Sequence, residues 1–145
     1  MEHLELEVTV NAPAQTVWDE ITNWVGQSQW MLGTKVSGTG NAIGGTIEAF
    51  TGIGRIGFLD TMEITRWDPP LRCDVLHTGR VVKGTGSFQV EVITPTTSKF
   101  IWIEDLDLPL GIVGKIGFKF VKPFFVFGVQ KSLNKFANFV HLKLK

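Results

Sequence analysis

Two side chains that could exchange a proton, Asp60 and His77, stand in otherwise apolar rows of two predicted strands. Residues 56–67 and 71–82 alternate so that both side chains point to the same inner face. A hairpin loop over residues 67–70 predicts a register with Asp60 directly opposite His77, their Cβ atoms about 5 Å apart. The pair could act as acid and base on a ligand carbonyl. It could also be structural, each group satisfying the other, because a buried carboxylate without a partner is costly.

Glu104 is a third candidate of the same kind. In the strand predicted over residues 99–108, Glu104 shares a row with Trp102, whose large apolar ring suits the lining of a pocket. The opposite row holds Ile101 and Ile103, which are equally suited to an interior. Alternation therefore allows Glu104 to point into the pocket or away from it. The catalytic candidates are Asp60, His77 and Glu104, and whether any reaction occurs stays open at this stage.

The remaining chemical motifs are explained better by structure than by catalysis. Residues 52–57 spell G-x-G-x-x-G, but they continue as a strand, so no helix N-terminus would face a pyrophosphate. His3, His77 and His141 fall on three different predicted elements, which disfavours a metal site. Cys73 lacks a neighbouring group that would activate its thiolate. We expect no cofactor and no metal.

Composition narrows the class of protein. The 145 residues include 14 Lys+Arg and 14 Asp+Glu, so no strong field favours nucleic acid. Lysines and prolines interrupt the apolar stretch at residues 108–129, which argues against a transmembrane segment. No signal peptide is evident, and we expect a cytoplasmic protein. The expected partner is a hydrophobic small molecule, with a weak homodimer as a further option.

Periodicity predicts an α+β protein with consecutive strands and few helices. One domain is expected over residues 1–145, since neither a linker nor a repeat interrupts the pattern. The predicted strands are 4–10, 34–37, 46–51, 56–67, 71–82, 86–94 and 99–108, and two short helices follow the first strand at 13–23 and 27–32. Tight turns between strands indicate antiparallel pairing.

A long C-terminal helix is the best-defined element, and Pro123 suits its first turn. An apolar arc on its surface must be buried, and the concave side of the sheet is the surface available for it. The arc consists of Phe125, Val126, Val129, Leu133, Phe136, Ala137, Phe139 and Val140.

Several short motifs occur in an order that resembles the polyketide cyclase/dehydrase-like branch of the SRPBCC superfamily, also called START-like or Bet v 1-like. They are Val10-Asn11-Ala12-Pro13 with Val17-Trp18, Gln29-Trp30, Trp67-Asp68-Pro69-Pro70, the stretch from Gly79 to Gly86, and Trp102 to Gly111 (WIEDLDLPLG). The resemblance covers essentially the whole chain. It implies a helix-grip fold, in which a curved antiparallel sheet of about seven strands wraps around the C-terminal helix. Members include lipid carriers, binders of hydrophobic ligands, polyketide aromatases and cyclases, and co-chaperones, so the fold alone leaves the function open.

We therefore expect a hydrophobic small molecule, such as a lipid, an isoprenoid or a polyketide-like compound, in a cavity between sheet and helix. One alternative is a polyketide cyclase or dehydratase that uses the pocket His/Asp pair. Another is a module that docks on a protein or membrane through exposed phenylalanines near residues 111–127. The predicted ligand-binding residues are Trp30, Phe58, Asp60, Met62, His77, Trp102, Glu104, Phe125, Val129 and Phe136.

Overall fold

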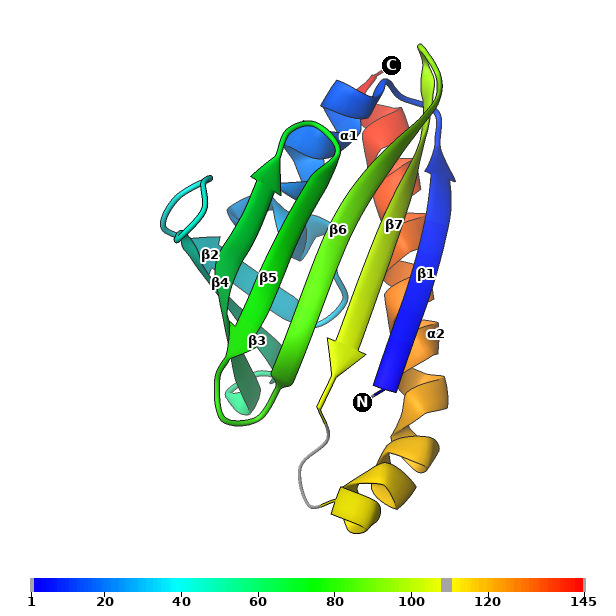
Figure 1. Ribbon diagram of the computed structural model, residues 1–145. Helices are drawn as coiled ribbons and strands as arrows, with labels where there is room; N and C mark the ends of the chain where they lie inside the picture. The colour runs from blue at the N-terminus through cyan, green and yellow to red at the C-terminus, as the bar shows by residue number, and fades with distance from the viewer. Residues whose placement is uncertain (1, 108–110, 145) are drawn as a thin grey trace.

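An antiparallel β-sheet curls around a long C-terminal helix in the computed structural model, which describes residues 2–107 and 111–144 (Figure 1). The sheet has seven strands in the order β1-β7-β6-β5-β4-β3-β2. This arrangement confirms the predicted helix-grip fold with two short helices after the first strand. In chain order the elements are β1 Glu2–Val10, α1 Ala14–Ile21, the 3₁₀ helix η1 Val25–Gln29, β2 Thr34–Gly38, β3 Thr46–Ile53, β4 Ile56–Asp68, β5 Arg72–Thr78, β6 Lys83–Thr94, β7 Thr97–Leu106 and α2 Gly111–Lys143.

The first strand pairs with the last one, whereas β2 to β7 follow one another as hairpins. In the β1–β7 ladder Leu6 lies opposite Trp102, and Leu4 lies opposite Glu104. This pairing makes β1 the edge of the sheet and gives β7 a neighbour on both sides. Trp102 and Glu104 are consequently held inside the sheet, where both neighbouring ladders restrain the backbone.

Aromatic rings fill the space between the sheet and the C-terminal half of α2. Trp30, Phe100 and Phe136 are all fully buried. The ring centroids of Trp30 and Phe136 are 4.9 Å apart, and those of Phe100 and Phe136 are 5.2 Å apart. Rings tilted against one another at these distances have favourable edge-to-face contacts in addition to their apolar burial. This cluster anchors α2 on the sheet.

The register predicted between β4 and β5 is wrong by two residues. His77 lies opposite Met62 and not opposite Asp60. The hairpin closes at the pair of Asp68 and Arg72, which displaces the pairing by three residues, and the bulge between Ile64 and Arg66 reduces the displacement to two. Side chains alternate between faces with a period of two, so an even displacement leaves each residue on its predicted face. Asp60 and His77 therefore share the concave face as diagonal neighbours.

The predicted start of the C-terminal helix at Pro123 is also wrong. The helix begins at Gly111, and Pro123 lies inside it. Proline removes one backbone donor, and the carbonyl of Lys119 loses its partner. This half of the helix is exposed, so water can hydrate that carbonyl and the helix can continue. The segment between β7 and α2, residues 108–110, lies outside the described residues. It includes the last residue of the strand predicted over 99–108 and part of the WIEDLDLPLG motif.

Candidate functional site

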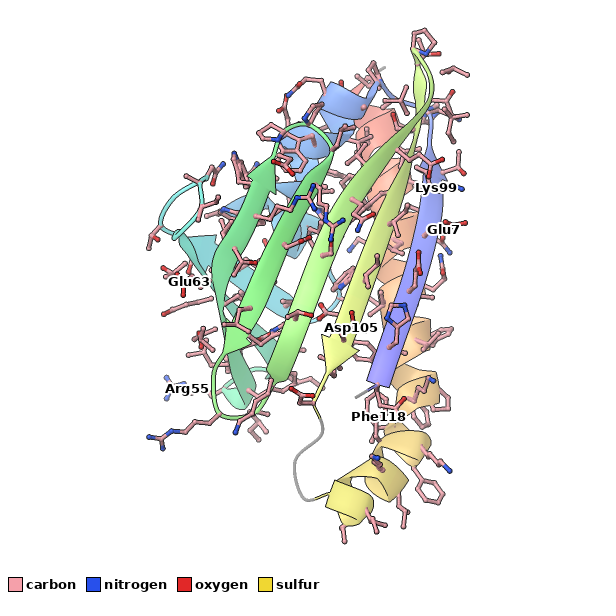
Figure 2. All side chains as sticks on the ribbon, viewed as in Figure 1. Glu7, Arg55, Glu63, Lys99, Asp105 and Phe118 are labelled. Carbon is pink, nitrogen blue, oxygen red and sulfur yellow. The ribbon has the colours of Figure 1, made fainter. Side chains whose placement is uncertain are left out.

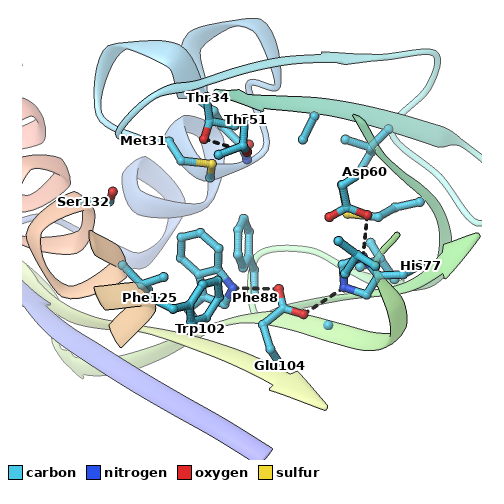
Figure 3. Close-up of a pocket in the computed structure, with 18 of the residues that line it drawn as sticks. Met31, Thr34, Thr51, Asp60, His77, Phe88, Trp102, Glu104, Phe125 and Ser132 are labelled. Atoms are coloured by element: carbon cyan, nitrogen blue, oxygen red, sulfur yellow. Dashed lines mark hydrogen bonds and ion pairs between the residues drawn. The ribbon is translucent and has the colours of Figure 1, made fainter. Parts of the chain in front are cut away.

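A cavity of about 350 Å³ lies between the concave face of the sheet and the segments that cover it, namely the residues around η1 and the middle of α2 (Figure 3). Its wall is mainly apolar, and its volume lies in the range of small-molecule sites. The lining residues are Trp24, Gln27, Met31, Leu32, Thr34, Ile47, Ala49, Thr51, Phe58, Asp60, Met62, Cys73, Val75, His77, Val82, Gly86, Ser87, Phe88, Trp102, Glu104, Leu106, Phe124, Phe125, Gly128, Val129 and Ser132.

Four side chains form a continuous polar cluster in this wall (Figure 3). His77 Nδ1 lies 2.8 Å from Asp60 Oδ1, and His77 Nε2 lies 2.8 Å from Glu104 Oε2. The second oxygen of Glu104, Oε1, accepts a hydrogen bond from Trp102 Nε1 at 2.9 Å. A carboxylate thus binds each nitrogen of the imidazole, and Trp102 orients the one that belongs to Glu104.

A glycine in β6 makes room for this cluster. His77 on β5 and Glu104 on β7 are separated by β6, where Gly86 lies opposite Glu104. A Cβ atom on Gly86 would come within 3.0 Å of Glu104 Oε2 and 3.2 Å of Val75 Cγ2. Without that side chain, the Glu104 carboxylate can reach across β6 to the imidazole. The bare backbone of Gly86 is therefore part of the site.

The electrostatics of the cluster depend on the charge of His77. Burial by itself lowers the pKa of this imidazole, but hydrogen bonds to Asp60 and Glu104 and the charges of both groups outweigh burial and raise the pKa to about 10. At neutral pH both ring nitrogens carry protons and donate to carboxylates. Two carboxylates and one imidazolium leave the cluster with one net negative charge.

One acceptor of the cluster is open to a ligand. Asp60 uses Oδ1 to hold His77, and within the described chain its Oδ2 has no hydrogen-bond partner. Both oxygens of Glu104 are engaged, and both nitrogens of His77 donate. A ligand that reaches this wall would therefore meet a carboxylate oxygen that is ready to accept a hydrogen bond.

The raised pKa of His77 predicts that the free energy of unfolding decreases gradually as the pH rises above neutrality. The pKa of about 10 in the folded protein lies above the ordinary histidine pKa of 6.5, so folding favours the protonated ring. This contribution is complete below pH 6.5 and is lost as pH rises toward 10. In an NMR titration, His77 should remain an imidazolium past neutrality, while the free energy of unfolding declines across the same interval. A midpoint for His77 near 6.5 would contradict the doubly bonded geometry.

The structure brings most of the predicted site residues together. Phe58, Asp60, Met62, His77, Trp102, Glu104, Phe125 and Val129 line the cavity, which assigns the Glu104 row of β7 to the inner face. Trp30 and Phe136 do not line it, and instead they pack on Phe100 in the core beside it. Periodicity identifies which face a side chain occupies, but it does not separate pocket wall from filled core on that face.

Sequence reasoning missed several lining residues. Phe88 lies on β6 opposite Trp102, and alternation within the predicted strand 86–94 could have found it. Thr34 and Thr51 meet across β2 and β3 with their hydroxyl oxygens 3.1 Å apart. Ser132 of α2 accepts the backbone N–H of Leu32, which ties the segment after η1 to the helix. No local pattern announces these polar contacts, because they join elements distant in sequence.

A metal ion does not fit this cluster. Its acidic and imidazole groups are turned toward one another, and no set of ≥ 3 such side chains within residues 2–107 and 111–144 is arranged to hold a metal. The thiol of Cys73 lies in the wall of the cavity, and burial together with the charge of Asp74 raises its pKa to about 12. Cys73 is therefore a protonated, apolar part of the wall.

The chain is similar to proteins of one family. The sequence profile of the family described as polyketide cyclase / dehydrase and lipid transport matches residues 1–139, whereas no curated protein shows significant sequence similarity. The Zhui aromatase/cyclase from Streptomyces sp. R1128 has a TM-score of 0.83 at 14% identity, with 99% of this chain and 96% of that chain covered. The di-domain aromatase/cyclase BexL from the BE-7585A biosynthetic pathway has a TM-score of 0.76 at 17% identity, with 98% and 47% covered. The protein TTHA0849 from Thermus thermophilus has a TM-score of 0.78 at 13% identity, with 99% and 100% covered. At these identities the structural similarity shows a shared fold.

Proposed function

Since the chain belongs to the polyketide cyclase / dehydrase and lipid transport family, we propose that it reversibly binds a hydrophobic small molecule whose polar end donates a hydrogen bond. The observation that carries this proposal is an apolar cavity with a negatively charged polar cluster in its wall. A lipid alcohol, an isoprenoid alcohol, a phenolic polyketide or an amine has the required chemistry.

The apolar wall supports binding through burial of hydrocarbon. Aromatic rings and a thioether from three separate parts of the fold face the cavity, among them Met31, Phe88 and Phe125. Removing a methylene group from water contributes about 0.8 kcal/mol, so a chain of moderate length gains several kcal/mol there. The wall thus accounts for affinity without dictating one ligand.

The charge of the cluster supports selectivity at the polar end. Among the described residues, neither lysine nor arginine lines the cavity. A ligand carboxylate or phosphate would lose its hydration while facing the uncompensated charge shared by Asp60 and Glu104. A hydroxyl or ammonium group could instead donate to Asp60 Oδ2. The cavity should therefore favour alcohols and amines over fatty acids.

A second candidate function is the cyclisation and dehydration of a polyketide-like chain. The specific observation in its favour is the proton-bearing cluster inside a fold shared with two aromatase/cyclases. In that function Asp60, not His77, would be the base, because a doubly donating imidazolium has no free lone pair at neutral pH. Incubation with a linear poly-β-carbonyl chain tests this candidate. Loss of water from the chain, abolished by Asp60→Asn, would establish catalysis, and recovery of the unchanged chain favours binding alone.

Calorimetric titration with decanol, decylamine and undecanoate tests the binding proposal, because these ligands share one decyl chain and differ only in the polar end. We expect decanol and decylamine to bind, and undecanoate to bind at least about tenfold more weakly near neutral pH, a difference of about 1.4 kcal/mol. Asp60→Asn removes the net charge of the cluster and should reduce the discrimination against undecanoate.

Glu63→Gln is the matched control, since Glu63 is an exposed carboxylate on the outer face of the same strand (Figure 2). This variant should discriminate among the three ligands as the unmodified protein does. If undecanoate bound most tightly of the three ligands, the proposed polar end would be wrong. Failure of all three to bind would remove the carrier function for simple chains, and native mass spectrometry of the purified protein would then show whether another apolar ligand is retained.

A further inference from the structure

The N-terminal half of α2 presents an apolar surface that no other described element covers. Exposed side chains recur at intervals of three or four residues, with Ile112 76%, Phe120 75% and Phe124 78% exposed. In Figure 1 this half of the helix, drawn in yellow, extends past the end of the sheet. The apolar stripe consists of Ile112, Ile116, Phe120, Phe124 and Phe127. Exposed apolar surface of this extent marks an interaction site.

The charges around the apolar stripe all have one sign. From Gly111 to Lys143 the helix contains neither aspartate nor glutamate. Lys115, Lys119 and Lys122 follow one another at helical spacing beside the stripe, and none of them forms a salt bridge with a described residue. On the next turns, the Nζ atom of Lys131 lies 5.9 Å from the centre of the Phe127 ring. The face is therefore both apolar and cationic, although the chain as a whole has no net charge.

We propose that this face of α2 lies in the surface of an anionic lipid bilayer. An apolar stripe flanked by lysines is the pattern of a helix that rests in the plane of the interface, with rings among the acyl chains and ammonium groups at the phosphates. This half of α2 is not proposed to cross the bilayer, because no described helix is sufficiently long and apolar to span a membrane. Charge complementarity favours the bilayer over a second copy of this chain, whose corresponding face would be equally cationic.

The position of Phe124 connects this surface to the cavity. Its side chain borders the cavity, yet it is largely exposed and belongs to the apolar stripe. The neighbouring Phe125 faces the cavity from the same turn of the helix. Docking of the stripe would therefore bring the wall of the cavity against the bilayer. The docking itself stands on the exposed stripe and its charges, and does not depend on which ligand the cavity holds.

Co-sedimentation of the full chain with lipid vesicles tests the proposal. One set of vesicles contains phosphatidylcholine alone, and the other contains phosphatidylcholine mixed with phosphatidylglycerol. We expect binding to the mixed vesicles, weaker binding to the neutral ones, and a decrease as salt is added. The double variant Ile116→Asn, Phe120→Asn should bind the mixed vesicles at least about tenfold more weakly, because both apolar anchors are lost. Lys119→Gln should weaken binding by about fivefold.

Two controls separate docking from general effects. Ile93→Asn changes an exposed apolar residue at the far end of β6, and Lys35→Gln changes an exposed lysine on β2, so neither should alter vesicle binding. Circular dichroism checks that each variant is folded. Equal binding by the double variant and the unmodified chain would overturn the proposal. The proposal would also be overturned if the chain binds neither set of vesicles and sedimentation velocity shows a dimer that is lost in the double variant.

Discussion

Replacement of His77 by leucine is expected to lower the free energy of unfolding by about 3–5 kcal/mol near neutral pH. The imidazolium side chain is 2% exposed, and the side chains of Asp60 and Glu104 are 15% and 13% exposed. Leucine would leave two carboxylates near one another without the positive charge between them. Urea unfolding followed by tryptophan fluorescence measures the change. The two proteins should have the same dependence of the unfolding free energy on urea concentration, so that the shift of the midpoint reports stability.

A variant that removes every charge in the cluster is the informative control. Asp60→Asn, His77→Gln and Glu104→Gln together keep the side-chain volumes and the capacity for hydrogen bonds. Because a buried ion cluster contributes little net stability over a neutral one, the triple variant should be much more stable than the single leucine variant. If His77→Leu stays within about 1 kcal/mol of the unmodified protein, the cluster does not hold the charges assigned to it.

Replacement of Ala49 by phenylalanine is expected to weaken binding of decanol by more than about a hundredfold. Ala49 is buried on β3, borders the cavity and lies opposite Asp60 in the ladder with β4. A phenyl ring there would displace about four methylene groups of a ligand, equivalent to about 3 kcal/mol of burial. Calorimetric titration measures the loss of affinity.

Leu59→Phe provides the matched control for the larger ring. Leu59 is 48% exposed and lies next to Asp60 on the outer face of β4, so its replacement adds a ring without entering the cavity. The control should bind decanol as the unmodified protein does. Unfolding of both variants must be compared, since overpacking of Ala49→Phe can cost about 1–3 kcal/mol. Unchanged decanol binding by a folded Ala49→Phe variant would place the ligand outside this cavity.

The contrast between Asp60 and Trp30 shows how far the sequence could predict the site. Alternation assigned Asp60, His77 and Glu104 to inward rows, although it left the opposite face open for Glu104. The assignment survived an error of two residues in the β4–β5 register, because side-chain direction has a period of two along a strand. Trp30 was also predicted to bind the ligand, yet it packs into the core. Whether an inward side chain lines the cavity or is packed in the core depends on which neighbouring side chains surround it. Periodicity contains no information about those neighbours.

The sequence by itself determined the fold class, the antiparallel order of hairpins and the inner faces of β4 and β5, because these follow from local alternation, turn residues and an amphipathic helix. Only the tertiary structure decided that His77 is held by two carboxylates. That contact needs the bulge in β4, the glycine at position 86 in β6 and the place of β7 between β6 and β1. It also decided that the helix continues through Pro123 and leaves its first half exposed. Both outcomes depend on pairing and packing between segments far apart in the chain, whose energies no local pattern of residues records.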